Sequence, residues 1–469
     1  MTFLANLLWF LSCLPGWVAF WVVAGNPART QRCVLRRLLR ENRNSEFGHR
    51  HRFSEIKNEQ DFARMVPLAE YENFEKAVEL LRRGVGNVLT REMPFLLEPT
   101  SGSTGNPKLI PQTRAVRKEF QRAIAPWIAS LYLRNPALFF GRQYWAISPA
   151  TKMDFPESAV RIGFSDDADY LGAVGRFVWD KVMSLTPDTE NVRLVSVWHP
   201  SFLTTAARGD VRPLVRVLSA WDGVTARSHL ETLRKKFPKA RFQAKGLLAT
   251  EGIVSLPLGM DGMKPLAIRS HYLEFADMET GEVCGVAGLA QGREYSVVLS
   301  TGGGLWRYKL HDRVRVTGCF RKTPCVEFIG KDNAVSDLVG EKLSERHCAE
   351  AIATATQETK EHPLFAMVTP DAGAMGYVLK VEFAAPDREM AQCWAEIMER
   401  EFCKNFHYCH ARKIGQLMVL RAELVHNGSA TFLRRAQMNR NMRTATVKLP
   451  ALDYQPCCTR SVRARKSSV

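Results

Sequence analysis

The sequence predicts an α/β protein with a large amino-terminal domain and a small α+β carboxy-terminal domain. Apolar residues make up 46% of the chain and charged residues 24%, as is usual for a globular protein. Segments rich in β-branched and aromatic residues alternate with segments of helical periodicity, which favours layers of strands and helices. The pattern changes near residues 327–345, and the elements beyond that point form a set of domain size.

Helices are expected where apolar residues recur every three or four positions. Residues 31–53 predict an amphipathic helix followed by a turn, with Val34, Leu35, Leu38 and Leu39 on one face. Two further helices are expected in the large domain, at 72–83 and from about 114 to 133. Strands are expected in segments bounded by Gly, Pro or Asp, namely 192–199, 240–250, 294–301, 304–310 and 313–320.

The small domain is expected to begin within the segment GKDN. It comprises a helix at 343–356, a strand pair in FAMV and GYVLKVEF, a helix at 388–402 and a closing strand in QLMVLRAEL. The chain is therefore divided into four parts: an apolar segment 1–28, a large domain 29–332, a small domain 333–458 and a basic tail 459–469.

Residues 1–28 contain no charged side chain, and the apolar run Phe3–Val23 is long enough to cross the ~30 Å hydrocarbon layer as a helix. A basic region typical of a secretory signal is missing before it, so cleavage is not expected. Arginines within 29–40 would keep the following chain on the cytoplasmic side. We expect a cytoplasmic protein that this segment tethers to the inner face of a membrane. The alternative is a buried helix broken at Pro15 and Gly16.

The net charge of +17 raises nucleic acid, an anionic membrane or an acidic substrate as partners. Much of this charge is local, and no basic stripe is interleaved with aromatic residues, so no nucleic acid is expected. The eleven cysteines are an odd number without a CxxC pair, which favours a reducing compartment. Cys403, His407, Cys409 and His410 lie close enough in sequence for zinc, but helical spacing favours ordinary packing instead.

Residues 100–108 read TSGSTGNPK, which is typical either of a solvated loop or of a cradle for phosphates. The stretch offers three kinds of donor: backbone amides freed by Gly102 and Gly105, hydroxyls of Ser101, Ser103 and Thr104, and the ammonium group of Lys108. It differs from the common phosphate-binding loop, in which the lysine directly precedes Ser or Thr. The spacing alone therefore leaves both interpretations open.

Five segments occur in an order that resembles a known family: FSEIKNEQDFARMVPLAEYENF, TSGSTGNPKLIP, LLATEG, GLWRYKLHDRVRVTG and FIGKDNAVSDLVGEKLSE. Together they are similar to the auxin-responsive acyl acid–amido synthetases, the Gretchen Hagen family of adenylate-forming enzymes. The resemblance extends from about Gln31 to Pro450. It implies a large domain of β-sheets flanked by helices, with a barrel-like part, and a small mobile domain that turns between two half-reactions.

The resemblance also implies ATP and Mg²⁺ as cofactors and a role for each matching residue. Ser101, Gly102, Ser103, Thr104, Gly105 and Lys108 would hold the β- and γ-phosphates, Thr250 would lie near the α-phosphate, Glu251 would engage magnesium, Asp312 with nearby Tyr308 would hold the ribose, Lys331 and Asp332 would form the hinge, and Lys448 would reach the α-phosphate during adenylation. For Glu251 and Asp312 the alternative is an ordinary loop carboxylate, and for Lys448 a surface lysine.

The acyl pocket is expected to draw on the helix after Arg114 and on Trp198 and His199, although a packed histidine is the alternative for His199. Three positions depart from the family pattern. His311 stands where Gly usually precedes the ribose-binding Asp, Lys331 stands where Arg is common, and the segment before Lys448 lacks the usual aromatic residue. These departures leave every required acid in place.

The sequence thus predicts a ligase that adenylates a small carboxylic acid and transfers the acyl group to an amino acid amine, releasing AMP and pyrophosphate. One alternative passes the acyl group to a thiol such as coenzyme A. Others are a non-catalytic membrane-tethered relative and a basic scaffold that binds anionic lipid. Which acid and which amino acid are used stays open at this point.

Overall fold

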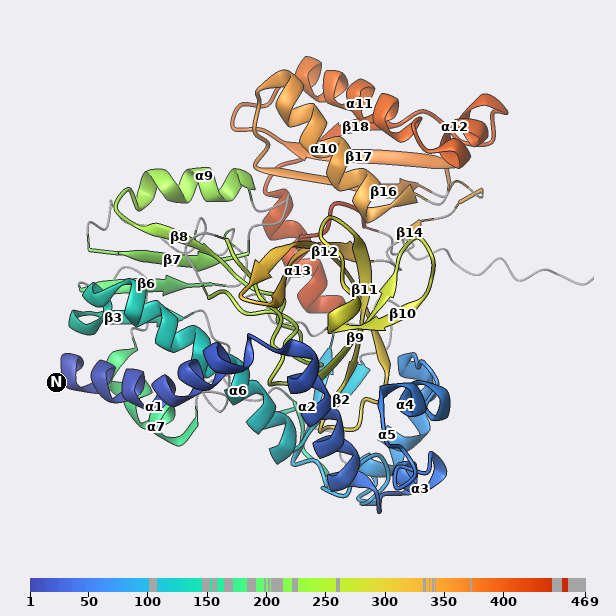
Figure 1. The fold of residues 1–469 in the computed structure, drawn as a ribbon. Coiled ribbons are helices and arrows are strands. Elements are labelled where there is room, and N and C mark those ends of the chain that lie inside the picture. Colours follow the sequence, from blue (N-terminus) through green and yellow to red (C-terminus); the bar gives the residue numbers. More distant parts are fainter. Residues whose placement is uncertain are drawn as a thin grey trace, which may run out of the picture. The chain divides into compact units, whose positions relative to one another are not determined.

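The computed structural model describes most of the 469 residues. It leaves out 101–107, 146–151, 154–157, 164–171, 184–190, 198–199, 201–202, 204–213, 222–226, 259–261, 332–334, 337, 340, 342, 372, 441–448 and 454–469. The chain divides into two compact units (Figure 1). The first comprises Met1–Ile329 with Ala436–Val447, and the second comprises Gly330–Arg435 with Lys448–Val469.

The helices of the first unit concentrate in its amino-terminal third. They are α1 Thr2–Val23, α2 Pro27–Asn42, α3 Glu46–Arg50, α4 Glu59–Met65, η1 Tyr71–Asn73, α5 Glu75–Arg82, α6 Arg114–Arg134, η2 Pro136–Phe140, α7 Gly172–Val182, α9 Arg227–Lys236 and η5 Val286–Gly288. Side-chain oxygens of Asn26, Ser45, Asn58 and Thr113 accept hydrogen bonds from the first turns of α2, α3, α4 and α6. These N-caps explain where the four helices begin.

Three sheets form the β-layers of the first unit. A mixed sheet has the order β2 Lys108–Gln112, β1 Leu96–Thr100, β5 Ile162–Gly163 and β4 Lys152–Met153. A parallel sheet has the order β3 Arg142–Trp145, β6 Val192–Ser196, β7 Val217–Ala220 and β8 Arg241–Ala244. A five-stranded sheet has the order β10 Val283–Gly285, β9 Tyr272–Asp277, β11 Glu294–Ser300, β12 Tyr308–Phe320 and β13 Thr323–Lys331.

One apolar core joins the five-stranded sheet to the amino-terminal helices. The four apolar residues predicted to share a face of α2 are all buried there, together with Trp306 and Phe275. The indole nitrogen of Trp306 donates to the carbonyl of Leu89 at 3.0 Å, so the largest core side chain keeps its polar atom satisfied. This core fixes β12 and its neighbours, which carry several of the predicted site residues.

The second unit is a smaller α+β body. Its strands are β14 Val335–Ser336 paired with β15 Leu343–Ser344, and a sheet of β16 Phe365–Asp371, β17 Gly376–Glu382 and β18 Arg421–Leu424. Its helices are α10 Glu345–Thr359, α11 Arg388–Phe402 and α12 Phe406–Lys413, and α13 Gly428–Arg440 begins in it. Helices α10 and α11 pack together, with Trp394 of α11 and Leu379 of β17 fully buried in the core.

The α/β class with a large and a small body is confirmed. Helix α11 has the predicted bounds, and α6 differs from its prediction by about one residue. The two strands predicted at 304–310 and 313–320 are wrong as separate elements, because β12 is one strand of 13 residues. The alternative for residues 1–28 included a helix break at Pro15 and Gly16, and that break is wrong, since α1 is helical through both residues.

Candidate active site

Lys108 stands at the end of the hairpin that carries the Ser/Gly loop. Strands β1 and β2 pair antiparallel, with Thr100 opposite Lys108, the two described residues that flank positions 101–107. The Lys108 ammonium group lies 3.3 Å from the Tyr308 hydroxyl oxygen, and 5.6 Å and 5.8 Å from the ring centroids of Tyr71 and Tyr308. Two aromatic faces therefore hold this cation at the start of β2.

Tyr308 is the point around which the predicted residues gather. It is almost fully buried at the start of β12. Burial raises the pKa of the Tyr308 phenol, and the nearby charges of Glu251, Glu70 and Asp312 raise it further. Tyr308 therefore stays neutral, with carboxylates near it from two distant segments, Glu70 and Glu251, and from its own strand, Asp312. A neutral phenol among these charges can donate a hydrogen bond without adding another negative charge.

Tyr71 closes the other side of Lys108. Its hydroxyl accepts a hydrogen bond from the backbone N–H of Leu109 at 2.7 Å and lies 3.3 Å from the Leu109 carbonyl. Burial raises the pKa of Tyr71 to about 12. The ring is thus pinned to β2, directly beside the residue whose ammonium group it faces.

Thr250 and Glu251 occupy the tip of a tight turn. Ala249 and Gly252 exchange backbone hydrogen bonds of 3.0 Å and 3.1 Å across it, which leaves the two central side chains half-exposed. The Gln112 side-chain amide donates to the Thr250 carbonyl at 3.4 Å and so links the turn to β2. The turn and the hairpin are therefore neighbours, although 138 positions separate these two residues.

The His271 side chain packs against the turn at Gly252 and leaves no room for a larger residue there. A Cβ at this position would come within 3.0 Å of the His271 ring. That ring cannot move freely, because its Nδ1 donates to the Glu119 carboxylate at 2.8 Å and both side chains are buried. The other ring nitrogen, Nε2, is buried and has no hydrogen-bond partner among the residues that the structure describes.

Glu119 connects this histidine to a second glycine segment. Its carboxylate also accepts the backbone N–H of Gly302 at 3.0 Å and an Arg37 guanidinium N–H at 3.3 Å. One buried acid thus links α6, the residue His271 just before β9, and the Gly-rich segment that leads into β12. We call Glu119, His271 and Gly252 the buried support of the turn.

Asp312 and His311 lie in a bulge of β12. The register shifts between the pairs Ser296↔Arg313 and Val298↔Lys309. One residue of β11 lies between these pairs and three residues of β12 do, so the extra residues belong to β12. His311 adopts φ of 61°, a left-handed conformation that favours glycine. Its Nε2 lies 2.5 Å from a Glu70 carboxylate oxygen, whereas Asp312 is buried. The bulge thus accommodates the side chain that replaces the expected glycine.

Glu70 receives two cationic partners on this face. Burial alone would raise the pKa of Glu70, but the hydrogen bonds and charges of His311 and Lys309 lower it overall. The Lys309 ammonium group lies 3.1 Å from the carboxylate. The acid therefore remains ionised and holds the bulge in place.

Several predicted site residues lie outside the described part of the chain. They are Ser101, Gly102, Ser103, Thr104 and Gly105 of the loop, Trp198 and His199 of the acyl pocket, Asp332 of the hinge, and Lys448. Lys331 is described and half-buried at the end of β13. The structure thus brings together Lys108, Thr250, Glu251, Tyr308 and Asp312.

Sequence reasoning missed the residues that position this group. Tyr71 and Glu70 come from the segment before α5. They lie in the first of the five family-like segments, but no role was predicted for either residue. Glu119 carried a signal, because it lies on the apolar stripe of α6 with Val116, Phe120 and Ala123. A single acid on such a stripe is almost never fully buried unless it is paired. His271 had no comparable signal.

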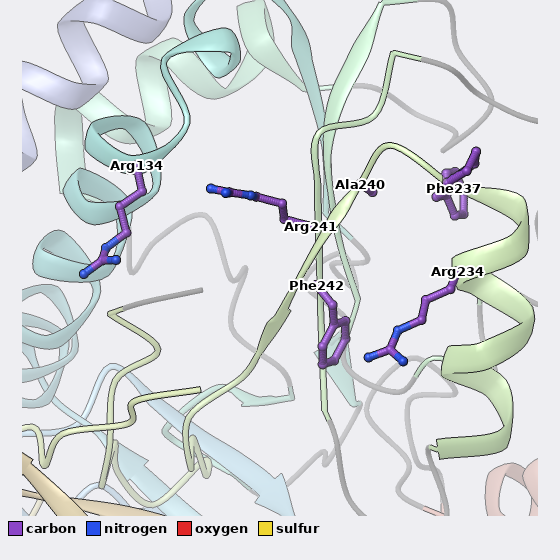
Figure 2. A pocket seen from close by; sticks show the side chains of 7 residues that line it. Arg134, Arg234, Phe237, Ala240, Arg241 and Phe242 are labelled. Atoms are coloured by element: carbon purple, nitrogen blue, oxygen red, sulfur yellow. The ribbon is translucent and has the colours of Figure 1, made fainter. Parts of the chain in front are cut away.

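A separate cavity of about 940 Å³ opens beside strand β8 (Figure 2). Its lining consists of Arg134, Arg234, Phe237, Pro238, Ala240, Arg241 and Phe242. Arg241 and Phe242 leave the strand in different directions, as expected for neighbours in a strand. Among the described residues, none of those predicted to bind nucleotide or acid lines this cavity.

The nine cysteines that the structure describes are free thiols. Cys403 lies at the end of α11, and His407, Cys409 and His410 lie on α12. Within the described ranges, no group of three or more His, Cys, Asp or Glu side chains is arranged to hold a metal ion. The zinc alternative therefore gains no support.

The domain patterns of one family match two parts of this chain. Residues 20–163 match the GH3 family N-terminal domain, and residues 265–331 match the GH3 family central domain. These stretches contain Lys108, Tyr308 and Asp312. The chain belongs to the GH3 family. This is the family whose motifs the sequence resembles.

Curated relatives of the GH3 chain match over limited stretches. A jasmonoyl–L-amino acid synthetase of Nicotiana attenuata is 26% identical over 152 residues, which is 31% of this chain and 26% of the relative. The indole-3-acetic acid-amido synthetase GH3.4 of Arabidopsis thaliana is 30% identical over 102 residues, covering 22% and 15% of the two chains. The matched stretches thus span about a quarter or less of these relatives.

Solved structures extend the likeness to nearly the whole GH3 chain. The AtGH3.15 acyl acid amido synthetase in complex with 2,4-DB superposes with a TM-score of 0.79 at 16% identity, covering 94% of both chains. A second GH3.15 structure gives a TM-score of 0.77 with 92% coverage of both. At this identity the likeness establishes the fold.

Proposed function

We propose that this GH3 chain is an ATP- and Mg²⁺-dependent acyl acid–amido synthetase. The observation that carries the proposal is the gathering of Lys108, Glu251, Tyr308 and Asp312 from three separate segments around the ends of the Ser/Gly loop. Family membership and the names of the matched relatives, which are amido synthetases, add support. The substrates are a small carboxylic acid and an amino acid.

In the first half-reaction, a carboxylate oxygen of the acid attacks the α-phosphorus of ATP, and the bond to the pyrophosphate oxygen breaks. Both reactants are anionic, so the site must bring two negative charges together. It must also stabilise the further negative charge that develops in the transition state. Lys108, held between Tyr71 and Tyr308, would face the phosphates gathered by residues Ser101–Gly105. Buried Asp312 would accept hydrogen bonds from the ribose hydroxyls, and Tyr308 would lie beside it.

The residues present fit a magnesium ion. Mg²⁺ takes hard oxygen ligands and usually binds through one or two carboxylates plus substrate phosphates. Glu251 offers such a carboxylate at the tip of a turn, where its side chain is half-exposed. When bound, the ion would neutralise phosphate charge. The turn itself would be kept in position by the buried support, with Thr250 next to the α-phosphate.

In the second half-reaction, the amine nitrogen of the amino acid attacks the acyl carbon, the bond to AMP breaks and the amine loses a proton. We propose that residues 333–458 act as a lid that turns about Lys331 and Asp332 between the two steps, and that Lys448 reaches the α-phosphate during the first. Trp198, His199 and α6 would line the acyl pocket. Closure would keep water from the reactive acyl-adenylate.

The test is acid-dependent exchange of pyrophosphate into ATP by purified full chain. Lys108→Ala and Glu251→Ala should each lower the exchange rate by about 10²–10³-fold, the usual loss when a group that stabilises developing charge is removed. The matched controls are Lys57→Ala and Glu279→Ala, which change the same charges at exposed positions. Equal rates in all four variants would overturn the site assignment.

We also propose a cytoplasmic protein that contacts a membrane through residues 3–23. The supporting observation is α1, a helix long and apolar enough to cross a membrane by length and composition. Its first charged neighbours are arginines.

A further inference from the structure

Helix α1 is fastened to the first unit along its inner face. Trp9 and Cys13 are buried in a cluster with residues of α6, η2 and α7, whereas Phe20 is buried in the core of the five-stranded sheet and stacks on Phe320. A Cβ on Gly16 would lie 2.8 Å from the Ala125 Cβ, so α1 and α6 approach closely at that point. Figure 1 shows α1 lying lengthwise along this part of the unit.

Asn6 locks the amino-terminal half of α1 in place. Its side-chain amide donates to the carbonyls of Leu138, Phe139 and Gly141 at 3.0–3.1 Å. Its side-chain oxygen accepts from the Tyr132 hydroxyl at 2.6 Å and from the Gln143 amide at 3.1 Å. If α1 left the unit to cross a bilayer, this amide would enter hydrocarbon and its buried partners would lose their hydrogen bonds. Each of these two changes is unfavourable.

The outer face of α1 is apolar and uncovered among the described residues. Leu4, Leu8, Leu11, Pro15, Val18 and Val22 follow one another at helical spacing and form a single line. The five residues of this line other than Pro15 are 49–61% exposed. Leu4 and Val22 are 18 positions apart in this helix, so the line extends for about 27 Å. An apolar surface of this kind marks a contact site rather than ordinary solvent-facing surface.

Neighbouring segments extend the line. The ring of Phe3 stacks on Phe140, which is 62% exposed, with 5.1 Å between centroids. Helix α7, which packs beside α1, adds Val174 and Phe177 at 44% and 70% exposure. We call the outer line of α1 together with Phe3, Phe140, Val174 and Phe177 the apolar face.

A cationic border follows the carboxy-terminal end of α1. The Arg321 guanidinium lies 3.9 Å from the ring centroid of Trp21, which is half-exposed. On α2, the exposed side carries Arg29, Arg32, Arg36 and Arg40 at helical spacing, while the apolar residues are buried. The first acidic residue of the chain is Glu41. Exposed Trp beside arginine, next to an apolar helix face, is typical of a contact with lipid headgroups.

We propose that the apolar face lies in the plane of an anionic membrane and that α1 does not cross it. This deepens the proposed membrane contact and gives its geometry. The arginines favour anionic lipid over a second copy of this chain, because a symmetric pairing through α1 would bring two arginine-bordered surfaces to one contact. The membrane would then hold the first unit at its surface, with the fold of that unit intact.

The first test is flotation of the purified full chain with vesicles of phosphatidylcholine containing 30% phosphatidylserine, and with vesicles of phosphatidylcholine alone. The chain should float with the anionic vesicles. Leu8→Asp/Leu11→Asp should abolish flotation, whereas the matched control Ile414→Asp/Met418→Asp, which changes exposed apolar residues of the second unit, should not. Arg29→Gln/Arg36→Gln should weaken binding about fivefold per arginine, since each is worth about 1 kcal/mol near such a surface.

Unfolding by urea confirms that each variant is folded. No flotation of the wild type, or equal flotation of the Leu8/Leu11 variant, would overturn the proposal. If the wild type formed dimers but did not bind vesicles, and the Leu8/Leu11 variant were monomeric, the apolar face would be a contact with a second copy of the chain. Retention of the wild type in cell membranes after washing at pH 11 would show a crossing helix. Vesicle binding is measured without ATP or acid, so its outcome is independent of the proposed synthetase activity.

Discussion

The buried support predicts a large effect of one side chain that would touch no substrate. Glu119 is 1% exposed and accepts hydrogen bonds from His271, Gly302 and Arg37. In Glu119→Ala the ring of His271 and the backbone N–H of Gly302 would lose their partner inside the unit. Each buried orphan costs about 1–3 kcal/mol, and removing one partner of a buried ionic pair costs about 3–5 kcal/mol.

The free energy of unfolding should therefore fall by about 3–5 kcal/mol in Glu119→Ala, a large part of the ~5–15 kcal/mol that stabilises a typical domain. Urea unfolding followed by tryptophan fluorescence measures it. With a slope of about 3 kcal/mol/M, the midpoint should move down by roughly 1–2 M. Glu119→Gln should lose less, because it keeps one oxygen acceptor although its NH₂ group would meet Arg37 or His271.

The matched control is Glu279→Ala. Glu279 pairs with Arg293 in the same unit, but its side chain is 80% exposed, so its loss should cost less than about 1 kcal/mol. A Glu119→Ala protein that unfolds within about 0.5 kcal/mol of the wild type would refute the reasoning. It would mean that the contacts of Glu119 contribute nothing net.

Three further predictions concern the turn and the bulge. Gly252→Ala should lower ATP affinity, measured by calorimetry, because a Cβ 3.0 Å from the fixed His271 ring would displace the turn carrying Glu251, and unchanged affinity would count against that support. His311→Gly should be more stable to urea than His311→Ala by about 1 kcal/mol, because φ of 61° disfavours any residue with a Cβ, and the reverse order would show no strain there. Glu70 has a pKa below its usual 4.5, so it stabilises the fold above that pH and the contribution is lost as the pH falls. The stability of His311→Ala should consequently fall less steeply below pH 4.5 than that of the wild type, and parallel curves would contradict the pairing.

Local patterns predicted the helices well because their signals are local. In α6 and α11, an apolar stripe begins directly after a capping residue, Thr113 in one and Asp387 in the other. The strand β12 was predicted as two because the polar pair His311–Asp312 resembles a turn. In the structure these residues form a bulge, which depends on the opposite strand β11 and is invisible to a local pattern.

The site was predictable only in part for a similar reason. The Ser/Gly loop and the residues Glu251 and Asp312 were found through ordered motifs. Glu119 and His271 are 152 positions apart, and Glu70 and His311 are 241 positions apart. A local sequence pattern therefore cannot predict that either pair is in contact. The fate of α1 also depends on tertiary structure: its composition suggests a membrane span, but the partners of Asn6 come from residues 132–143.

The most direct test of the central claim is identification of the product. The full chain is incubated with ATP, Mg²⁺, a panel of aryl and alkyl carboxylic acids, and mixed amino acids, with coenzyme A in a parallel series. Mass spectrometry then reads the products, and AMP and pyrophosphate are quantified. We predict an amide of one acid with an amino acid, with one AMP and one pyrophosphate per amide. A thioester in place of the amide, or no product from any acid while ATP still binds, would contradict it.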